Sequence, residues 1–361
     1  MSGAIAGAGG NPALTVLIAG SAAIKRRFDT LTAQASSGLI SNTFSGLGAS
    51  APAALTLRPR IESLKAALAN IDAASGPAQV TQSAMKRIQG IAANLMAGLP
   101  NLNGLNPAGV DTIAASARAN LVQVGELLNS QFGGAYVFSG QDTGNPPVPN
   151  AEQLLSSGFF AQISGAVAGL SVNGAAVTAS TTLTAAASNA PGSSPFSAYM
   201  SQGPGTAMLP SVSLGDGQAR PIGLLASENV SSVSTGSSTT GSHMRDLMRA
   251  LATVGSLTSA QAGDANFSGL IADTQTSVTG AIVAMATDVG VLGEHQAALT
   301  ATQTTLGDMA QVLSAQLSPA ENVDMAATLS ALTQTQTQLQ ASYQLISAAN
   351  AMSLVKFLPA G

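Results

Sequence analysis

The chain has 361 residues, only 8% of them charged, and its formal net charge is −4. Because roughly a quarter of an ordinary globular protein is charged, Ala, Gly, Ser, Thr, Gln and Asn must cover much of this surface, and such side chains bury against a neighbouring subunit without desolvating an ion. The 13 basic residues are too few and scattered for a nucleic-acid surface, and the absence of cysteine excludes disulfides, thiol nucleophiles and sulfur-ligated metals.

The sequence predicts neither a cleaved signal peptide nor membrane insertion. The apolar segment 14–24 precedes the basic residues Lys25, Arg26 and Arg27, whereas a signal peptide carries its basic residues before the apolar segment. No apolar run approaches the ~20 residues that cross a bilayer. We therefore expect a soluble chain, or one exported by a route that needs no cleaved signal.

Heptad spacing predicts long helices in the first part of the chain, because steps of three and four residues place apolar side chains on one helical face. The first helix is predicted by the seam Leu14, Leu17, Ser21, Ile24, Phe28, Leu31 and Ala35. The second is predicted by the seam Leu57, Ile61, Leu64, Leu68, Ile71, Ser75, Ala78, Gln82 and Met85. A shorter helix is expected over residues 111–131.

Between residues 140 and 241 the heptads stop and Gly, Ser, Thr and Pro dominate. Asn-Gly in segment 172–175 and Asp-Gly in segment 214–217 are typical of hairpin turns, because these dipeptides tolerate positive φ. Alternation over 177–183 suggests a short strand. Segment 231–242 is also compatible with a flexible linker. We expect a separate, β-rich module here.

The heptad pattern returns in the last part of the chain. One helix is predicted by the seam Met285, Val289, Leu292, Gln296, Leu299, Gln303, Leu306, Ala310, Leu313 and Leu317. A final helix is predicted by the seam Met325, Leu329, Leu332, Gln336, Leu339, Tyr343, Ile346 and Asn350, and Pro319 marks a break before it. The helix over 285–317 would be about 50 Å long, which indicates a rod.

The sequence offers little for catalysis, a cofactor or a metal. His243 and His295 lie far apart without ligand-spaced carboxylates and are expected at solvent or interface positions. Segment 46–48, Gly-Leu-Gly, lacks the strand and further glycine of a phosphate-binding loop and is interpreted as a turn. Three acidic residues of the central segment are expected to be solvated loop charges, namely Asp142, Asp216 and Glu228.

Three stretches resemble the flagellin superfamily, which includes filament flagellins and the hook-associated junction protein. The first is segment 35–38, Ala-Ser-Ser-Gly, at the end of the first predicted helix. The second is segment 289–293, Val-Gly-Val-Leu-Gly, followed by Gln296 and Leu299. The third and most specific stretch comprises segments 322–326, 338–343 and 352–358. The likeness covers roughly the first 140 and last 110 residues.

The resemblance implies a mainly α fold: long antiparallel coiled-coil helical rods formed by both chain ends, with a small β-rich central insertion domain. Terminal helices over 1–45 and 320–361 would form the core of a polymer. Segments 46–139 and 245–319 would form an inner helical rod domain, and 140–244 a variable outer domain. The heptad seams themselves fit either an internal bundle or contacts between subunits, and we expect both uses.

The residues expected at the assembly interface are apolar residues of the two terminal helices: Leu14, Leu17, Ile24, Phe28, Leu31, Leu329, Leu332, Leu339, Tyr343, Ile346, Leu354 and Phe357. The resemblance also implies partners: copies of the chain itself, other flagellar axial proteins (hook-associated proteins and flagellin), the flagellar type III export apparatus and an export chaperone. It implies an extracellular, non-enzymatic subunit.

Segment 133–140, Gly-Gly-Ala-Tyr-Val-Phe-Ser-Gly, is similar to the stretch that closes the first half of the junction protein, whereas the Gln- and Thr-rich segment 333–340 fits a filament subunit equally well. The sequence therefore favours the hook–filament junction protein, with the main filament flagellin as the alternative. Two other classes stay open: an exported coiled-coil adhesin or secretion-tip protein, and an enzyme embedded in the insertion.

Overall fold

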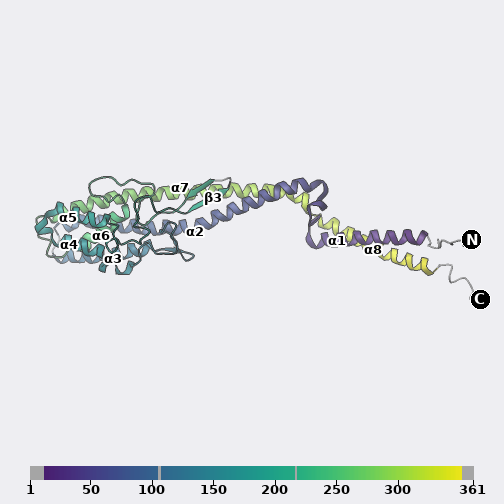
Figure 1. Ribbon diagram of the computed structural model, residues 1–361, viewed down its shortest axis with the longest axis horizontal. Coiled ribbons are helices and arrows are strands. Elements are labelled where there is room, and N and C mark those ends of the chain that lie inside the picture. Colours follow the sequence, from purple (N-terminus) through teal and green to yellow (C-terminus); the bar gives the residue numbers. More distant parts are fainter. Residues whose placement is uncertain (1–11, 105–106, 216–217, 352–361) are drawn as a thin grey trace, which may run out of the picture. The chain divides into compact units, whose positions relative to one another are not determined.

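The computed structural model describes residues 12–104, 107–215 and 218–351 (Figure 1). The chain divides into two compact units. The terminal unit comprises residues 1–65 and 308–361, and the central unit comprises residues 66–307. Helix α2 (Ala51–Leu102) and helix α7 (Phe267–Glu321) each contribute residues to both units.

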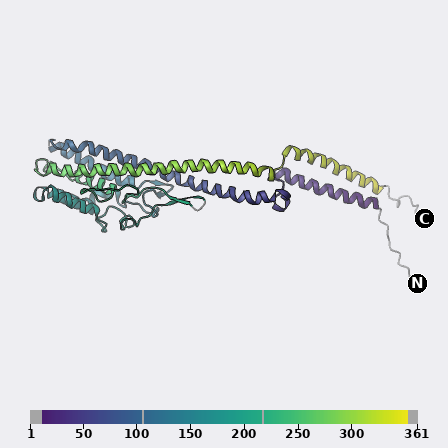
Figure 2. The same cartoon turned by 90° about the horizontal axis from the view of Figure 1, so that it is seen from above.

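Helices α1 (Pro12–Ser37) and α8 (Met325–Ala351) pair side by side in the terminal unit (Figures 1 and 2). They are antiparallel, because residue 39 just after α1 forms a β-bridge with residue 322 just before α8. The heptads of both ends therefore form helices, as the sequence predicts, and the two ends pair within one chain.

The connection from α1 to α2 is tied to the connection from α7 to α8. The Ile40 amide donates to the Glu321 carbonyl at 2.7 Å, and the Val323 amide donates to the Gly38 carbonyl at 3.0 Å. Gly38 has φ +72°, a left-handed conformation that glycine adopts without strain and that ends α1. Helix α7 includes Pro319 and ends at Glu321, so the predicted break falls two residues after the proline.

A small apolar core supports this connection in the terminal unit. Leu47 of the 3₁₀-helix η1 (Phe44–Ser50) packs with Ala54 and Ile61 of α2 and Leu317 and Ala320 of α7. Nearby, the Arg58 Nε atom lies 2.6 Å from the Glu321 carboxylate. Segment 46–48 forms a 3₁₀ turn here, as expected for a turn.

In the central unit, α2 and α7 pair antiparallel and in register. The Gln303 side-chain Nε2 atom donates to the Asp72 carboxylate at 2.6 Å, and the Thr279 hydroxyl lies 3.8 Å from the Met96 sulfur. The same number of residues separates Asp72 from Met96 on α2 as separates Thr279 from Gln303 on α7. The two helices therefore keep one register between these contacts. The predicted antiparallel helical rods are thereby confirmed.

Helix α6 (His243–Gly255) is the innermost helix of the central unit, with all its residues buried. It packs on α3 (Pro107–Leu128), where the Arg118 guanidinium donates to the Gly255 carbonyl at 2.6 Å. A Cβ atom at Gly255 would meet the Arg118 side chain at 3.0 Å, which explains the glycine at the end of α6.

The remaining elements of the central unit are short. Hairpin β1–β2 joins Gln131–Phe132 to Ala135–Tyr136, and hairpin β3–β4 joins Ser211–Gly215 to Gln218–Pro221. The 3₁₀-helix η2 (Ala151–Ser156) and helices α4 (Gly158–Ala168) and α5 (Leu170–Ala187) lie between these hairpins in sequence. The expectation of an Asp-Gly hairpin at 214–217 is confirmed, because β3 and β4 flank it.

The expected β-rich character of the insertion is wrong. Segment 177–183 lies in α5, and Asn173-Gly174 is a kink within that helix, with Gly174 at φ +78° and ψ 165°. The reason is tertiary: Thr182, Ala185 and Ala186 are small enough to bury one face of α5 as it packs on α4 and α6. Such packing overrides the modest strand preference of Val and Thr.

The hydrophobic core of the central unit is continuous from the rods into the insertion. It joins Met85 of α2, Leu121 of α3, Ile163 of α4, Leu251 of α6 and Val278 of α7 in one cluster. The division of the chain into three domains stays a prediction.

Helix α7 contains a stretch apolar enough, by length and composition, to cross a membrane. In the central unit much of its apolar face is occupied by packing, with Leu270, Val278 and Met285 fully buried. A core helix of this length meets the same criterion, so the stretch by itself is weak evidence for insertion.

Candidate assembly surface

The predicted seam of α1 faces α8. Leu17, Ile24, Phe28 and Leu31 are each half-buried, and Ser21 between them is buried. The α1 heptads therefore form a helix pair within the chain before any second copy is involved.

The seam of α8 is shifted relative to the predicted one. Leu332, Leu339 and Ile346 are half-buried, as the predicted seam requires. Three other predicted seam residues, Leu329, Gln336 and Tyr343, are exposed. The residues one position earlier in the sequence face α1 in their place, namely Thr328, Thr335 and Ser342. Threonine and serine are small enough to let the two helices approach. The Thr335 and Ser342 hydroxyls donate to carbonyls of α8, and the Thr328 hydroxyl donates to the Asp324 carbonyl just before α8.

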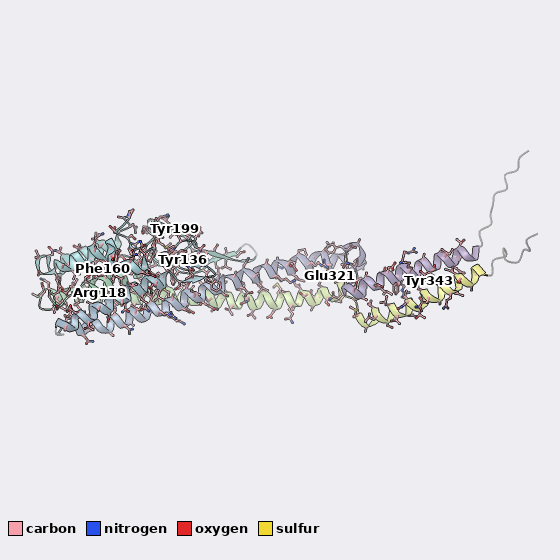
Figure 3. All side chains as sticks on the ribbon, turned by 90° about the horizontal axis from the view of Figure 1, so that it is seen from below. Arg118, Tyr136, Phe160, Tyr199, Glu321 and Tyr343 are labelled. Atoms are coloured by element: carbon pink, nitrogen blue, oxygen red, sulfur yellow. The ribbon has the colours of Figure 1, made fainter. Side chains whose placement is uncertain are left out.

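The shift leaves a second apolar stripe on α8 unpaired within the chain. Its members are Met325, Leu329 and Tyr343, whose side chains are 40%, 49% and 52% exposed (Tyr343 is labelled in Figure 3). Leu345 on α8 and Val16 and Ile18 on α1 are also more than half exposed. We call Met325, Leu329 and Tyr343 the outer stripe.

Helix α8 carries no charged residue between Met325 and Ala351. Nothing on its surface would need desolvating as an ion if a second copy covered it. Helix α1 carries the basic residues Lys25, Arg26 and Arg27, all exposed, and Lys25 forms an ion pair with Asp29 at 2.8 Å. The hydrogen bond and charge of Asp29 raise the pKa of Lys25.

The structure thus separates the predicted interface residues into two groups. Leu17, Ile24, Phe28, Leu31, Leu332, Leu339 and Ile346 pair α1 with α8, whereas Leu329 and Tyr343 are exposed. Leu354 and Phe357, and the side chain of Leu14, lie outside the described part of the chain. The exposed residues Val16, Ile18 and Leu345 were missed because they fall outside the regular heptad steps.

A buried polar cluster lies in the central unit, around α6. His243, 1% exposed, was expected at solvent or at an interface, and that expectation is wrong: its Nε2 atom lies 3.0 Å from the Asp288 carboxylate of α7. The same carboxylate accepts the amides of Val230, Ser231 and Ser232 at 3.0, 2.8 and 2.6 Å.

These bonds determine the charge state of Asp288. Burial alone would raise its pKa, but the hydrogen bonds from His243, Val230 and Ser231, with the charge of His243, outweigh burial and lower the pKa to about 2. Asp288 is therefore a carboxylate near neutral pH and anchors the segment that leads into α6. His295, the second histidine, is half-buried.

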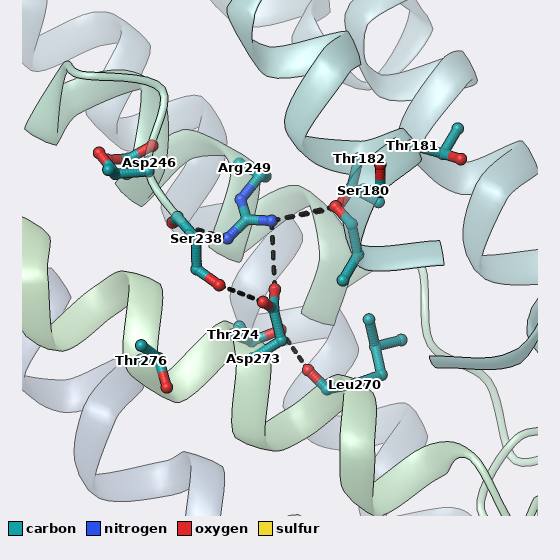
Figure 4. A network of polar contacts seen from close by, with 12 residues as sticks. Ser180, Thr181, Thr182, Ser238, Asp246, Arg249, Leu270, Asp273, Thr274 and Thr276 are labelled. Atoms are coloured by element: carbon teal, nitrogen blue, oxygen red, sulfur yellow. Dashed lines mark hydrogen bonds and ion pairs between the residues drawn. The ribbon is translucent and has the colours of Figure 1, made fainter. Parts of the chain in front are cut away.

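The two arginines of α6 tie the insertion to the rods. Arg249, 2% exposed, pairs with Asp273 of α7 at 3.2 Å (Figure 4). It also donates to the Ala179 carbonyl of α5 at 3.3 Å. The Asp273 carboxylate also accepts the Ser238 hydroxyl. Arg245 donates to the Ala186 carbonyl at 3.1 Å and caps the C-terminus of α5, while burial lowers its pKa.

This cluster does not have the geometry of a catalytic site. The Ser232 hydroxyl and the His243 Nδ1 atom are both buried, yet neither has a hydrogen-bond partner within the described residues, so this serine and this histidine do not form a nucleophile–base pair. The His, Asp and Glu side chains of the described segments form no group of three suited to a metal ion. The hydrogen bonds and ion pairs of the cluster join α5, α6 and α7, and in this way they stabilise the fold.

Two acidic residues of the insertion accept hydrogen bonds. Glu228 accepts the Gly205 amide at 2.9 Å, and Asp142 accepts the Asn145 side chain at 2.7 Å. Both hydrogen bonds lie at exposed positions, which is compatible with the expected solvated loop charges, and Asp216 lies outside the described part of the chain. Helix α6 was missed, although Met244, Leu247, Met248, Leu251 and Val254 show helical spacing.

Paired helices from the two chain ends, with an uncharged and partly apolar exposed face, define a helical structural subunit. Family comparison agrees: residues 18–143 match the bacterial flagellin N-terminal helical region, and residues 276–358 match the bacterial flagellin C-terminal helical region. The chain belongs to the flagellin family. No match was found among curated proteins. The family is structural and not enzymatic, and its members polymerise into the extracellular flagellar filament.

Proposed function

We propose that this chain is a flagellar axial subunit whose copies contact one another through the outer stripe of α8 and the exposed residues of α1. The observation that carries the proposal is the uncharged face of α8, on which Leu329 and Tyr343 are about half exposed. Burying such a face between copies gains apolar contact without desolvating charge. A contact of this kind propagates as a helical polymer when its rotation does not close.

Within the flagellum, we propose the hook–filament junction as its position, with the filament itself as the alternative. Support comes from segment 133–140, whose likeness is to the junction protein. Phe138 and Ser139 in this segment are buried, and Gly140 has φ +63° with the Met208 carbonyl beside it. The segment therefore joins the β1–β2 hairpin to the insertion, and substitutions within it would destabilise the fold.

Export through the flagellar type III apparatus, with a dedicated chaperone, follows from this position. The subunit would be secreted without a cleaved signal and would meet hook-associated proteins and flagellin in the assembled structure. Its loss would impair motility.

Location in the cell tests the proposal. The chain has no cysteine, so Val172→Cys, at a side chain 87% exposed, gives one reactive thiol for a fluorescent label. A single spot at the base of each filament supports the junction, and deletion of the gene should then release filament subunits into the medium. Label along the whole filament supports the filament flagellin, and label absent from flagella contradicts both.

A further inference from the structure

The turn that joins α2 to α3 contains an Asn-Gly pair outside any helix. Helix α2 ends at Leu102, and Asn103 and Gly104 follow as exposed turn residues. Gly104 has φ +103°, and no heavy atom lies within 4 Å of where its Cβ atom would be. Gly104 therefore carries no side chain of its own that could obstruct attack by its peptide nitrogen.

A second Asn-Gly pair, Asn173-Gly174, offers a comparison within the same chain. Asn173 is also exposed, but it lies inside α5, and its amide donates to the Gly169 carbonyl at 2.9 Å. Only Gly174 departs from helical dihedral angles within α5, so Asn173 itself keeps a helical backbone. The two pairs have the same chemistry and differ in backbone constraint.

We propose that Asn103 is a site of spontaneous deamidation through a succinimide, and that Asn173 is protected. In the first step the Gly104 nitrogen attacks the Asn103 side-chain Cγ atom. The new N–Cγ bond replaces the Cγ–Nδ2 bond, and the amide proton leaves with ammonia. Water then hydrolyses one of the two C–N bonds of the imide, which gives aspartate or isoaspartate without any redox step.

The backbone explains the difference between the two sites. Ring closure requires the ψ angle of the asparagine to rotate away from the helical region, so that the next nitrogen approaches Cγ. At Asn173 this rotation would disrupt α5, whereas a turn residue after the end of α2 has no helical hydrogen bonds to lose.

The product would change the turn in two ways. Either product adds one negative charge to a chain in which only 8% of residues are charged. Isoaspartate also inserts a methylene group into the main chain between Leu102 and Val110, both of which are fully buried in the hydrophobic core of the central unit. The modification would therefore loosen this end of the central unit as the protein ages.

Peptide mapping by mass spectrometry tests the proposal on the full-length protein. After incubation of folded protein at mildly alkaline pH, we expect conversion at Asn103 to exceed conversion at Asn173 several-fold. In denaturant the two rates should become similar, because both sites then have the same Asn-Gly chemistry without a folded backbone. Asn103→Gln should abolish the isoaspartate signal, detected by enzymatic methylation, from this turn while circular dichroism stays unchanged. Equal rates in the folded protein, or faster conversion at Asn173, would overturn the proposal.

Discussion

The Nε2 atom of His243 lies 3.0 Å from the Asp288 carboxylate, and both side chains are withdrawn from solvent. Through this carboxylate, helix α7 binds His243 at the N-terminus of α6. The same carboxylate binds the backbone amides of Val230, Ser231 and Ser232, which precede α6 in sequence. One acidic residue thus joins a rod of the central unit to the insertion.

Asp288→Asn should destabilise the protein, since an amide cannot accept the same set of hydrogen bonds. A pKa lowered from 3.8 to about 2 corresponds to about 2 kcal/mol of stabilisation at neutral pH. Denaturant unfolding at pH 7 measures this loss. Glu294→Gln, which removes an exposed carboxylate from the same helix, should leave stability within about 0.5 kcal/mol of the wild type.

The same substitution gives a pH dependence of defined sign. The folded-state pKa of Asp288 is below its unfolded value, so its contribution is complete above about pH 4 and is lost as pH falls toward about 2. The stability difference between the wild type and Asp288→Asn should shrink over this window. A difference that stays constant from pH 7 to pH 2 would contradict the role of the carboxylate.

Arg249→Met should cost about 3 kcal/mol, because it leaves Asp273 and the Ala179 carbonyl without their buried partner. Thermal unfolding followed by circular dichroism is the measurement. Arg87→Met, at an exposed position of α2, is the control and should unfold at the wild-type temperature.

Gly140→Ala should destabilise by about 1–3 kcal/mol, because the position has φ +63° and a Cβ atom would lie 2.6 Å from the Met208 carbonyl oxygen. Gly144→Ala is a matched control four residues away, with no heavy atom within 4 Å. If denaturant unfolding gave both variants the same stability, the steric account of Gly140 would be wrong.

Deleting residues 150–237 should lower the helical fraction per residue in circular dichroism. The sequence alone predicts the opposite, since the heptads break at both borders of this segment. In the structure, however, α4 and α5 cover α6, so the deletion would expose Leu247, Leu251 and the charged side chain of Arg249. A helical fraction above that of the wild type would show that the rods do not need the insertion.

The helical rods could be predicted from the sequence because a heptad repeat constrains the backbone directly. The phase of α8 could not, since Thr328, Thr335 and Ser342 are selected by how closely α1 approaches. The same limit explains α5: whether Val177 and Thr182 form a strand or a helix depends on packing against α6, which is distant in sequence.

The burial of the polar cluster was also beyond sequence reasoning. His243, Arg249 and Asp273 each look like ordinary surface residues, and only the assembled fold gives them partners. In contrast, the Asp-Gly turn between β3 and β4 was predictable, because its chemistry is local.

The central claim, that the outer stripe of α8 makes contacts between copies, is tested by Leu329→Asp. Leu329 is 49% exposed and does not pair α1 with α8, so the variant should keep the wild-type circular dichroism spectrum. Val172→Asp, at an exposed residue of the central unit, is the matched control. In cells that produce only one variant, the protein is quantified in sheared flagella and in the culture medium. We expect the wild type and Val172→Asp in flagella, and Leu329→Asp in the medium as folded monomer; recovery of Leu329→Asp in flagella at the wild-type amount would contradict the account.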